Sequence, residues 1–337
     1  MNMKLNLKLE TPRAVLEARA AKKGRNWFVE LLIFTVLFFV ISLAQSFAVV
    51  PVQIFLMSTD RGYLDAVAAG DYDLLMDAAA RLASSDPIII SMLFSNIFMI
   101  LITMLFCKLL QKRRMETLGF VKKDFLKEYG IGLVVGFAIF SAAVLLCVVT
   151  GSLKLTGFSA SFTPGIFLLF GLGFLIQGMA EEVLLRSYLF VSIGRRYPMW
   201  VAVILNALFF AALHLANSGI SVLAFLNLTL FGVFASVYFI KRGSIWGIGA
   251  LHSIWNFIQG NFYGIKVSGI ETSCTVFESV TTEGRGLIHG GAFGMEGGLA
   301  TTVVLVAGTL FLLTRKAKDG VFEAAEAGDA QPEKNFL

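Results

Sequence analysis

Long uncharged stretches dominate the chain, in place of the alternation of polar and apolar positions that marks a half-buried strand or helix. Seven of them are long enough to cross a bilayer as a helix, which takes about 17 to 25 residues. They are 31–59, 87–107, 129–153, 155–180, 197–240, 243–265 and 297–314. The stretch 197–240 is too long for one crossing and has a turn signal, Asn-Ser-Gly at 217–219, near its middle. It therefore predicts two helices.

Seven stretches, one of them divided in two, give eight helices, and the helix at 164–194 carries charge in its interior. The pattern predicts an all-α polytopic membrane protein. It has about eight transmembrane helices, with the active site inside the bundle. The expected spans are 27–50, 87–110, 129–150, 164–194, 198–215, 220–240, 244–262 and 298–314. We divide the chain into a basic cytoplasmic segment, two helices with an acidic outer loop, a core that carries the site, and a polar cytoplasmic tail. Their limits are 1–26, 27–128, 129–315 and 316–337.

Composition agrees with a membrane protein. Hydrophobic residues make up 57% and charged residues 15% of the chain, whereas roughly 25% of the residues in soluble proteins are charged. This excludes a water-soluble globule and a disordered chain. The first apolar run ends in no small-residue cleavage pattern, so we expect a retained membrane helix. The three cysteines are too scattered for a disulfide framework or a paired metal motif.

The basic residues favour one orientation in the membrane. With eight spans and both termini inside, 22 of the 28 Lys and Arg residues lie on the cytoplasmic side, as the positive-inside rule requires. We therefore expect a multi-pass protein of the plasma membrane with cytoplasmic N- and C-termini. The net charge of +5 reflects this bias and attraction to anionic lipid, so no nucleic-acid partner is expected.

Two outer connections are longer than turns. Residues 60–86 carry six aspartates among Ala and Leu and predict one or two short acidic helices. Residues 263–297 are rich in Gly, Ser and Thr and are expected to form either a lid or an unconstrained connector. The polar tail after Lys316 is expected to be disordered.

A few costly polar side chains lie inside the predicted spans. An ionisable residue at a helix centre costs about 2.5 to 3.5 kcal/mol on insertion scales, so each one needs an explanation. Each could singly be an interhelical hydrogen-bond partner or half of a structural ion pair. They are Glu181, Glu182 and Arg186 in the fourth span, His214 in the fifth, and His252 with Asn256 in the seventh.

Helix geometry separates these residues by role. Glu182 and Arg186, four residues apart, share a helix face and can neutralise each other, whereas Glu181 is turned about 100° away and is left free. His252 and Asn256 share a face for the same reason. At about 1.5 Å per residue, the free glutamate, the two histidines and the asparagine all lie roughly 15 to 21 Å from the cytoplasmic boundary. Their common depth predicts that they face one another.

This set of groups can hydrolyse a peptide bond in two ways. Burial in an apolar interior makes a carboxylate a better base near neutral pH. Glu181 with His214 could then activate water, while His252 and Asn256 stabilise the oxyanion. One glutamate and two histidines are also the ligands of many hydrolytic zinc sites. Both versions remain open, whereas H-E-x-x-H, G-x-S-x-G and paired intramembrane aspartates are missing from the sequence.

The motifs resemble the CAAX protease and bacteriocin-processing family (CPBP, also called ABI), which includes the Ras-converting CAAX endopeptidase. E-E-V-L-L-R at 181–186 matches E-E-x-x-x-R, F-A-A-L-H at 210–214 matches F-x-x-x-H, and H-S-I-W-N at 252–256 matches H-x-x-x-N. A Gly-rich string at 291–298 looks like one that bacterial members often carry after the third motif. The resemblance covers about residues 130–300.

The resemblance implies an eight-helix intramembrane endopeptidase of the CAAX type, with a glutamate or a metal mechanism. Glu181 and His214 would activate water, and His252 and Asn256 would support the oxyanion or a metal, while the Glu182 and Arg186 pair would shape the site. In the metal version, Zn²⁺ or another divalent metal would be held by Glu181, His214, His252 and Asn256. The substrate would be a membrane-associated protein or peptide, of which prenylated CAAX ends are the best-known target.

Two other classes of protein fit the same residues. A proton-coupled transporter could use Glu181 and the histidines as a relay, because pumps also place such groups at mid-bilayer. A non-catalytic immunity or scaffold protein of the membrane could carry them without turnover.

Overall fold

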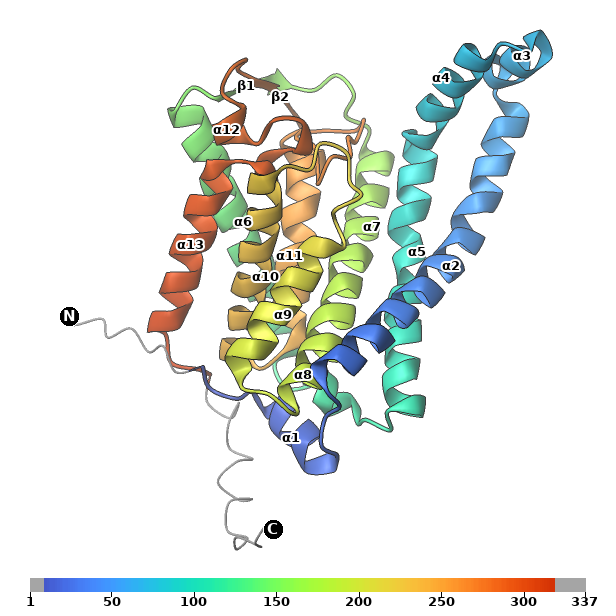
Figure 1. Ribbon diagram of the computed structural model, residues 1–337. Coiled ribbons are helices and arrows are strands. Elements are labelled where there is room, and N and C mark those ends of the chain that lie inside the picture. The colour runs from blue at the N-terminus through green and yellow to red at the C-terminus, as the bar shows by residue number, and fades with distance from the viewer. Residues whose placement is uncertain (1–8, 319–337) are drawn as a thin grey trace, which may run out of the picture.

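The structure is a computed structural model, and it describes residues 9–318. Most of these residues are helical, and a helix lies at each of the eight positions where a span was predicted (Figure 1). These helices are α2 (Trp27–Thr59), α5 (Asp86–Leu105), α6 (Phe125–Val149), α7 (Pro164–Glu182), α9 (Met199–Ala212), α10 (Val222–Arg242), α11 (Ile245–Phe257) and α13 (Leu299–Thr314).

Three of the helices continue beyond these limits through wider π-helical turns. α5 runs on into η1 (Phe106–Leu110), α11 runs on into η4 (Ile258–Phe262), and α7 continues through η3 (Val183–Phe190) into α8 (Val191–Gly194). All eight residues of η3 are buried. Since π turns inside α-helices are frequent at functional sites, the position of η3 directly after Glu182 is notable.

Five helical segments are long and apolar enough to cross a membrane. They are Trp27–Thr59, Asp86–Leu110, Phe125–Val149, Pro164–Gly194 and Val222–Arg242. The helices α9 and α13 are apolar but shorter. The chain is therefore an all-α polytopic membrane protein, as predicted, while the count of eight crossings stays a prediction.

The acidic outer connection forms two helices, as expected from its sequence. They are α3 (Arg61–Ala69) and α4 (Tyr72–Ala83). The side chains of Asp60 and Asp71 cap them by accepting hydrogen bonds from the backbone N–H groups of Tyr63 and Leu74, which satisfies donors that a helix N-terminus leaves free.

The basic N-terminal segment contains a helix that the sequence analysis did not predict. In α1 (Arg13–Ala21), Arg19 Nε donates to the carbonyl of Gly194 at the end of α8. A 3₁₀ turn, η2 (Met115–Leu118), lies beside it. Most of the predicted disordered tail, residues 319–337, lies outside the described residues.

The end of the bundle away from α1 carries a small antiparallel sheet that was not predicted (Figure 1). β1 (Leu153–Phe158) pairs with β2 (Phe277–Thr281), with an irregularity between Leu155 and Gly157. The rest of the second outer connection folds into short turns: α12 (Gly286–His289), η5 (Gly291–Phe293) and η6 (Met295–Gly297). This segment is therefore neither unconstrained nor a bare connector.

Close helix packing brings together the polar groups predicted to lie at a common depth, and small residues make this packing possible. α11 lies between α6 and α7, and α10 packs on α9 and α13. A Cβ added at Gly178 of α7 would lie 2.4 Å from the backbone nitrogen of Ser253 on α11. Because Ser253 follows His252, this contact sets the level at which the end of α7 meets that histidine.

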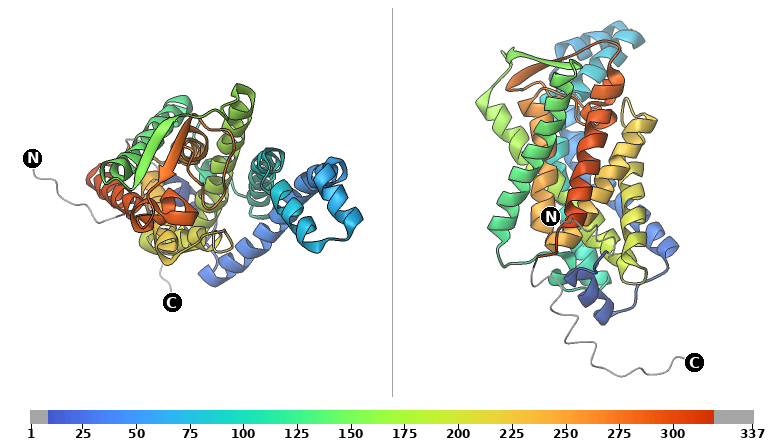
Figure 2. Two further views of the ribbon diagram at one scale, coloured as in Figure 1. Left: turned by 90° about the horizontal axis from the view of Figure 1, so that it is seen from above. Right: turned by 90° about the vertical axis from the view of Figure 1, so that its left-hand side faces the viewer.

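The helices α2 and α5 form a hairpin that stands to one side of the bundle (Figure 2). α5 packs against α7, and α2 packs mainly against α5. In Figure 1, α2 begins near α8 and leans away from the bundle towards α3 and α4. All buried residues of α2 lie at or before Ile41, so its outer half is not covered by the bundle.

Candidate active site

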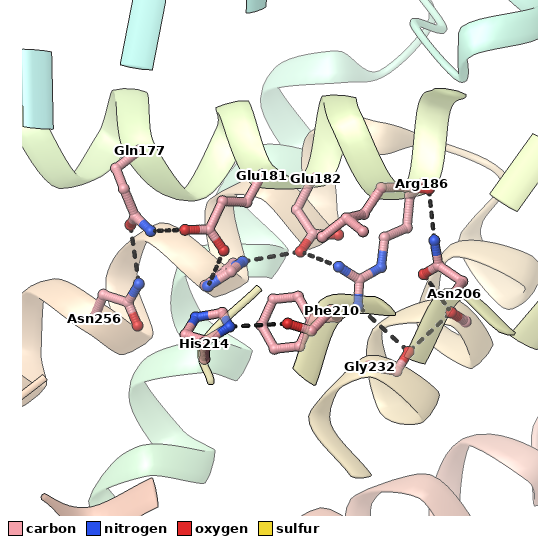
Figure 3. Close-up of polar contacts among 12 residues, drawn as sticks. Gln177, Glu181, Glu182, Arg186, Asn206, Phe210, His214, Gly232 and Asn256 are labelled. Carbon is pink, nitrogen blue, oxygen red and sulfur yellow. Dashed lines mark hydrogen bonds and ion pairs between the residues drawn. The ribbon is translucent and has the colours of Figure 1, made fainter. Parts of the chain in front are cut away.

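The four residues predicted to share a site line one cavity of about 500 Å³. Glu181 lies at the C-terminal end of α7, His252 and Asn256 lie on α11, and His214 follows α9. Side chains of α2 and α5 also line this cavity. The structure thus brings together polar groups that are far apart along the chain (Figure 3).

Glu182 contacts both its predicted partner and a histidine. Its Oε1 accepts a hydrogen bond from Arg186 Nη1 at 2.8 Å and lies 2.9 Å from His252 Nδ1. The side chains of Glu182 and Arg186 are both fully buried. The ion pair predicted from the i, i+4 spacing is present. Through the same oxygen, the Glu182 carboxylate also orients the imidazole of His252, as carboxylates commonly do for functional histidines. His252 Nε2 is thereby turned towards Glu181.

Glu181 points away from the ion pair and into the cavity, as the 100° helix offset predicts. Its Oε1 accepts a hydrogen bond from Gln177 Nε2. Its Oε2 lies 3.8 Å from His252 Nε2, which is too long for a direct hydrogen bond. Within residues 9–318, Glu181 Oε2 has no hydrogen-bond partner.

Gln177 is a site residue that the sequence analysis missed. Besides donating to Glu181, it accepts a hydrogen bond from Asn256 Nδ2 through Oε1 at 2.9 Å. One amide therefore links the glutamate of α7 to the asparagine of α11 (Figure 3). The available signal was its spacing, four residues before Glu181, inside a span where any polar side chain is costly.

His214 lies in a turn and not, as predicted, inside the fifth span. α9 ends at Ala212, and the backbone N–H groups of His214 and Leu215 bond three residues back. The carbonyl of Phe210, which a continuing helix would have paired with a backbone N–H, accepts from His214 Nδ1 at 2.9 Å. Because a carbonyl only accepts, Nδ1 carries the hydrogen, and Nε2 is left for other contacts.

Aromatic rings enclose the two histidines. The Phe210 ring lies 4.9 Å from the His214 ring and 5.8 Å from the His252 ring, measured between centroids. Arg186 Cζ lies 5.1 Å from the centroid of the same Phe210 ring, within cation–π range. The Phe231 ring lies 4.8 Å from His252. These contacts restrict both imidazoles to narrow orientations.

A metal centre needs three or four donors at about 2 Å from the ion. Among the residues that the structure describes, no group of three or more His, Cys, Asp or Glu side chains is placed to hold a metal ion. Glu181 Oε1 is engaged by Gln177, and His252 Nδ1 is engaged by Glu182. Within the described residues, these bonds leave Glu181 Oε2 and His252 Nε2 unengaged, 3.8 Å apart, and the expected Zn²⁺ or other divalent metal stays a prediction.

The Gly-rich string contributes a further acidic group, Glu296, to the cavity lining. Its Oε2 accepts two hydrogen bonds of 2.7 Å, from the backbone N–H and the hydroxyl of Ser268. Asn227 Nδ2 of α10 donates to the Glu296 carbonyl at 2.8 Å. Burial raises the pKa of the Glu296 carboxyl, against the hydrogen bonds from Ser268. The second outer connection therefore forms a packed wall of the cavity.

Comparison with family models gives a match over residues 163–258 to the family described as type II CAAX prenyl endopeptidase Rce1-like. The matched segment contains all three motifs and is shorter than the resemblance over residues 130–300. It leaves out the α2–α5 hairpin and the Gly-rich string. No curated protein and no solved structure matches the chain. Residues 163–258 are therefore similar to an Rce1-like domain of the CAAX protease family.

Proposed function

We propose that the protein is an intramembrane endopeptidase that hydrolyses a peptide bond of a membrane-associated protein or peptide. The observation that carries the proposal is the position of Glu181 Oε2. This oxygen belongs to a side chain that lines the cavity, is itself buried and free of hydrogen bonds within residues 9–318, and lies 3.8 Å from His252 Nε2. A general base needs such a free lone pair within reach of the proton that it removes.

In the proposed reaction, Glu181 Oε2 takes a proton from water while the water oxygen attacks the peptide carbonyl carbon. His214 Nε2, which is free because Nδ1 bonds to Phe210, accepts the other hydrogen of the water and orients it. Protonated Glu181 then gives its proton to the leaving nitrogen as the C–N bond breaks. The products are a new carboxyl group and a new amine.

The oxyanion that forms on attack requires hydrogen-bond donors. His252 is held by Glu182 through Nδ1, so in its protonated form it donates from Nε2 towards the cavity. Asn256 uses one amide hydrogen for Gln177 and has a second to offer. Glu182 and Arg186 are positioning residues in this scheme, because they act through His252.

The substrate follows from where the cavity lies. Its walls come from helices apolar enough to cross a membrane, so the peptide must be delivered from the bilayer or its surface. The name of the matched family makes a prenylated CAAX end the first candidate to test. The proposal places the protein in the plasma membrane, with both termini cytoplasmic.

The proposal is tested with purified protein in proteoliposomes and quenched fluorescent peptides that end in a farnesylated CAAX sequence. Matched peptides carrying a palmitoyl chain or no lipid define the substrate class.

Glu181→Gln should lower turnover at least about 100-fold, the usual minimum for a lost general base. Glu271→Gln, at an exposed outer-loop glutamate, is the control. Cleavage by Glu181→Gln at the wild-type rate would refute the proposal. A transporter or a scaffold protein would give no cleavage in any form.

A further inference from the structure

The α2–α5 hairpin, which lies outside the family match, forms one wall of the catalytic cavity. From α2 the lining residues recur at spacings of three to four, which places them on one helix face. They are Phe38, Ser42, Gln45, Ser46 and Val49. The neighbouring face of α2, about 100° round the helix, is apolar and exposed, with Phe39, Leu43 and Phe47 each more than 60% accessible.

The middle of the cavity-lining face of α2 is polar. Ser42, Gln45 and Ser46 form what we call the polar stripe of α2. Gln45 Nε2 donates to Asn96 Oδ1 of α5 at 3.1 Å. The Asn96 amide nitrogen is already used by the carbonyls of Met92 and Leu93 on its own helix.

The polar stripe keeps unused hydrogen-bonding groups. Within residues 9–318, nothing pairs with Gln45 Oε1 or with the hydroxyl of Ser42, and neither atom is sealed off from the cavity. If these polar side chains served only to hold α2 against α5, the Gln45–Asn96 hydrogen bond would be sufficient. The remaining donors and acceptors face the same space as Glu181.

A peptide undergoing hydrolysis needs partners of this kind. Its scissile carbonyl is accessible only when the backbone is extended, and an extended segment in a membrane interior has unpaired N–H and C=O groups that are costly there. From Phe38 to Val49 the lining face of α2 is about 16 Å long, which matches about five residues of extended chain. The polar stripe covers about two of them.

The outer half of α2 also leaves a route for such a segment. The buried residues of α2 end at Ile41, directly before the polar stripe. A segment approaching from the bilayer would therefore meet Ser42, Gln45 and Ser46 at the open side of the cavity and Glu181 on the inner side.

We propose that the polar stripe of α2 binds the backbone of an extended, membrane-associated peptide next to its scissile bond, while Phe38, Val49, Met92 and Met99 pack against its apolar side chains. This inference rests on the proposed function and names its substrate class: short extended apolar segments, recognised through backbone groups and with little dependence on sequence.

The test uses the quenched peptides in proteoliposomes, with the cleavage site first located by mass spectrometry. Gln45→Leu should raise KM about fivefold, as expected for the loss of one hydrogen bond, with kcat within about twofold of wild type. Ser42→Ala, which leaves the Gln45–Asn96 bond intact, should act in the same direction and covers the case in which Gln45→Leu fails to fold. Gln53→Leu, on the same helix but outside the cavity lining, is the matched control.

A second readout separates backbone binding from a structural role. Peptides in which single amides near the scissile bond are replaced by esters should lose affinity for the wild type at one or two positions. Ester replacement at those same positions should cause no further loss of affinity in Gln45→Leu. Additive losses at every position, or an unchanged KM in both variants, would overturn the inference. Cleavage by Glu181→Gln at the wild-type rate would instead refute the proposed function, on which this inference rests.

Discussion

His252 Nδ1 lies 2.9 Å from Glu182 Oε1, and both side chains are buried. Glu182 comes directly after Glu181 in the sequence, yet the two carboxylates lie on opposite sides of one imidazole, each nearest to a different ring nitrogen. One orients the ring from Nδ1, and the other faces Nε2 across 3.8 Å. The double glutamate thus gives a structural carboxylate and a free one at a single histidine.

Removing the Glu182 carboxylate should affect stability and activity together. Glu182→Ala leaves Arg186 fully buried without its counter-charge, and breaking such a pair costs about 3 to 5 kcal/mol of unfolding free energy. Thermal unfolding in detergent measures the loss, with Glu271→Gln as control. The double variant Glu182→Leu/Arg186→Met should recover much of the stability, because it removes both charges, but not the cleavage. Recovery of cleavage in the double variant would contradict the positioning role.

The packing of Gly178 on Ser253 should be needed for activity. A Cβ there would lie 2.4 Å from a backbone atom of α11, so Gly178→Ala should separate α7 from α11, lower cleavage at least about tenfold and cost about 1 to 3 kcal/mol of stability. Gly165→Ala is the control, because no heavy atom lies within 4 Å of its added Cβ. Equal activity of the two variants would show that the register of α7 and α11 does not position the site.

Glu296 should make stability depend on pH. Because burial raises its pKa above the ordinary value of 4.5, the folded state binds more protons than the unfolded state just above that pH. Stability should therefore fall as pH rises from about 4.5 through the raised pKa. Glu296→Gln should remove this part of the slope. Melting temperatures between pH 4.5 and 7.5 measure it, and identical profiles would contradict the assignment.

Chelation should separate the two versions of the mechanism. The glutamate-base version predicts that cleavage survives dialysis against EDTA and 1,10-phenanthroline, with no stoichiometric metal found by elemental analysis of the active protein. Loss of activity that Zn²⁺ restores would support the metal version and contradict the glutamate-base version.

Cysteine labelling in intact cells tests the orientation. Cysteines introduced at Ser84 or Glu283, exposed in the two outer connections, should react with a membrane-impermeant maleimide. A cysteine at Lys122, exposed between α5 and α6, should react only after permeabilisation. The three native cysteines are buried and provide the unlabelled background. The reverse pattern would place the termini outside.

Much of the fold could be predicted because apolar stretches reveal spans directly. The Glu182–Arg186 pair followed from a four-residue spacing on one helix. Contacts between helices could not be predicted in the same way: the bond between Glu182 and His252 depends on how far α7 slides along α11, which the Gly178 contact sets. Common depth indicated that the groups meet, but not which atoms.

Other features were missed because their signal is weak along the chain. Gln177 is uncharged and does not stand out inside a span. Glu296 reaches the cavity only because Ser268, 28 residues earlier, holds its carboxylate. His214 lies beyond the end of its predicted helix, and its own side chain, in place of a backbone N–H, donates to the Phe210 carbonyl. Strands β1 and β2 are short, and more than 100 residues separate them.

The most direct test of the account follows the oxygen of the attacking water. Under single-turnover conditions in H₂¹⁸O, wild-type protein should place one ¹⁸O in the new carboxyl terminus of the cleaved peptide and none in the Glu181 side chain. Glu181→Gln should form this labelled product at least about 100-fold more slowly. Labelled product from Glu181→Gln at the wild-type rate, or ¹⁸O appearing in Glu181 as expected for a covalent intermediate, would contradict a glutamate that acts as a base on water.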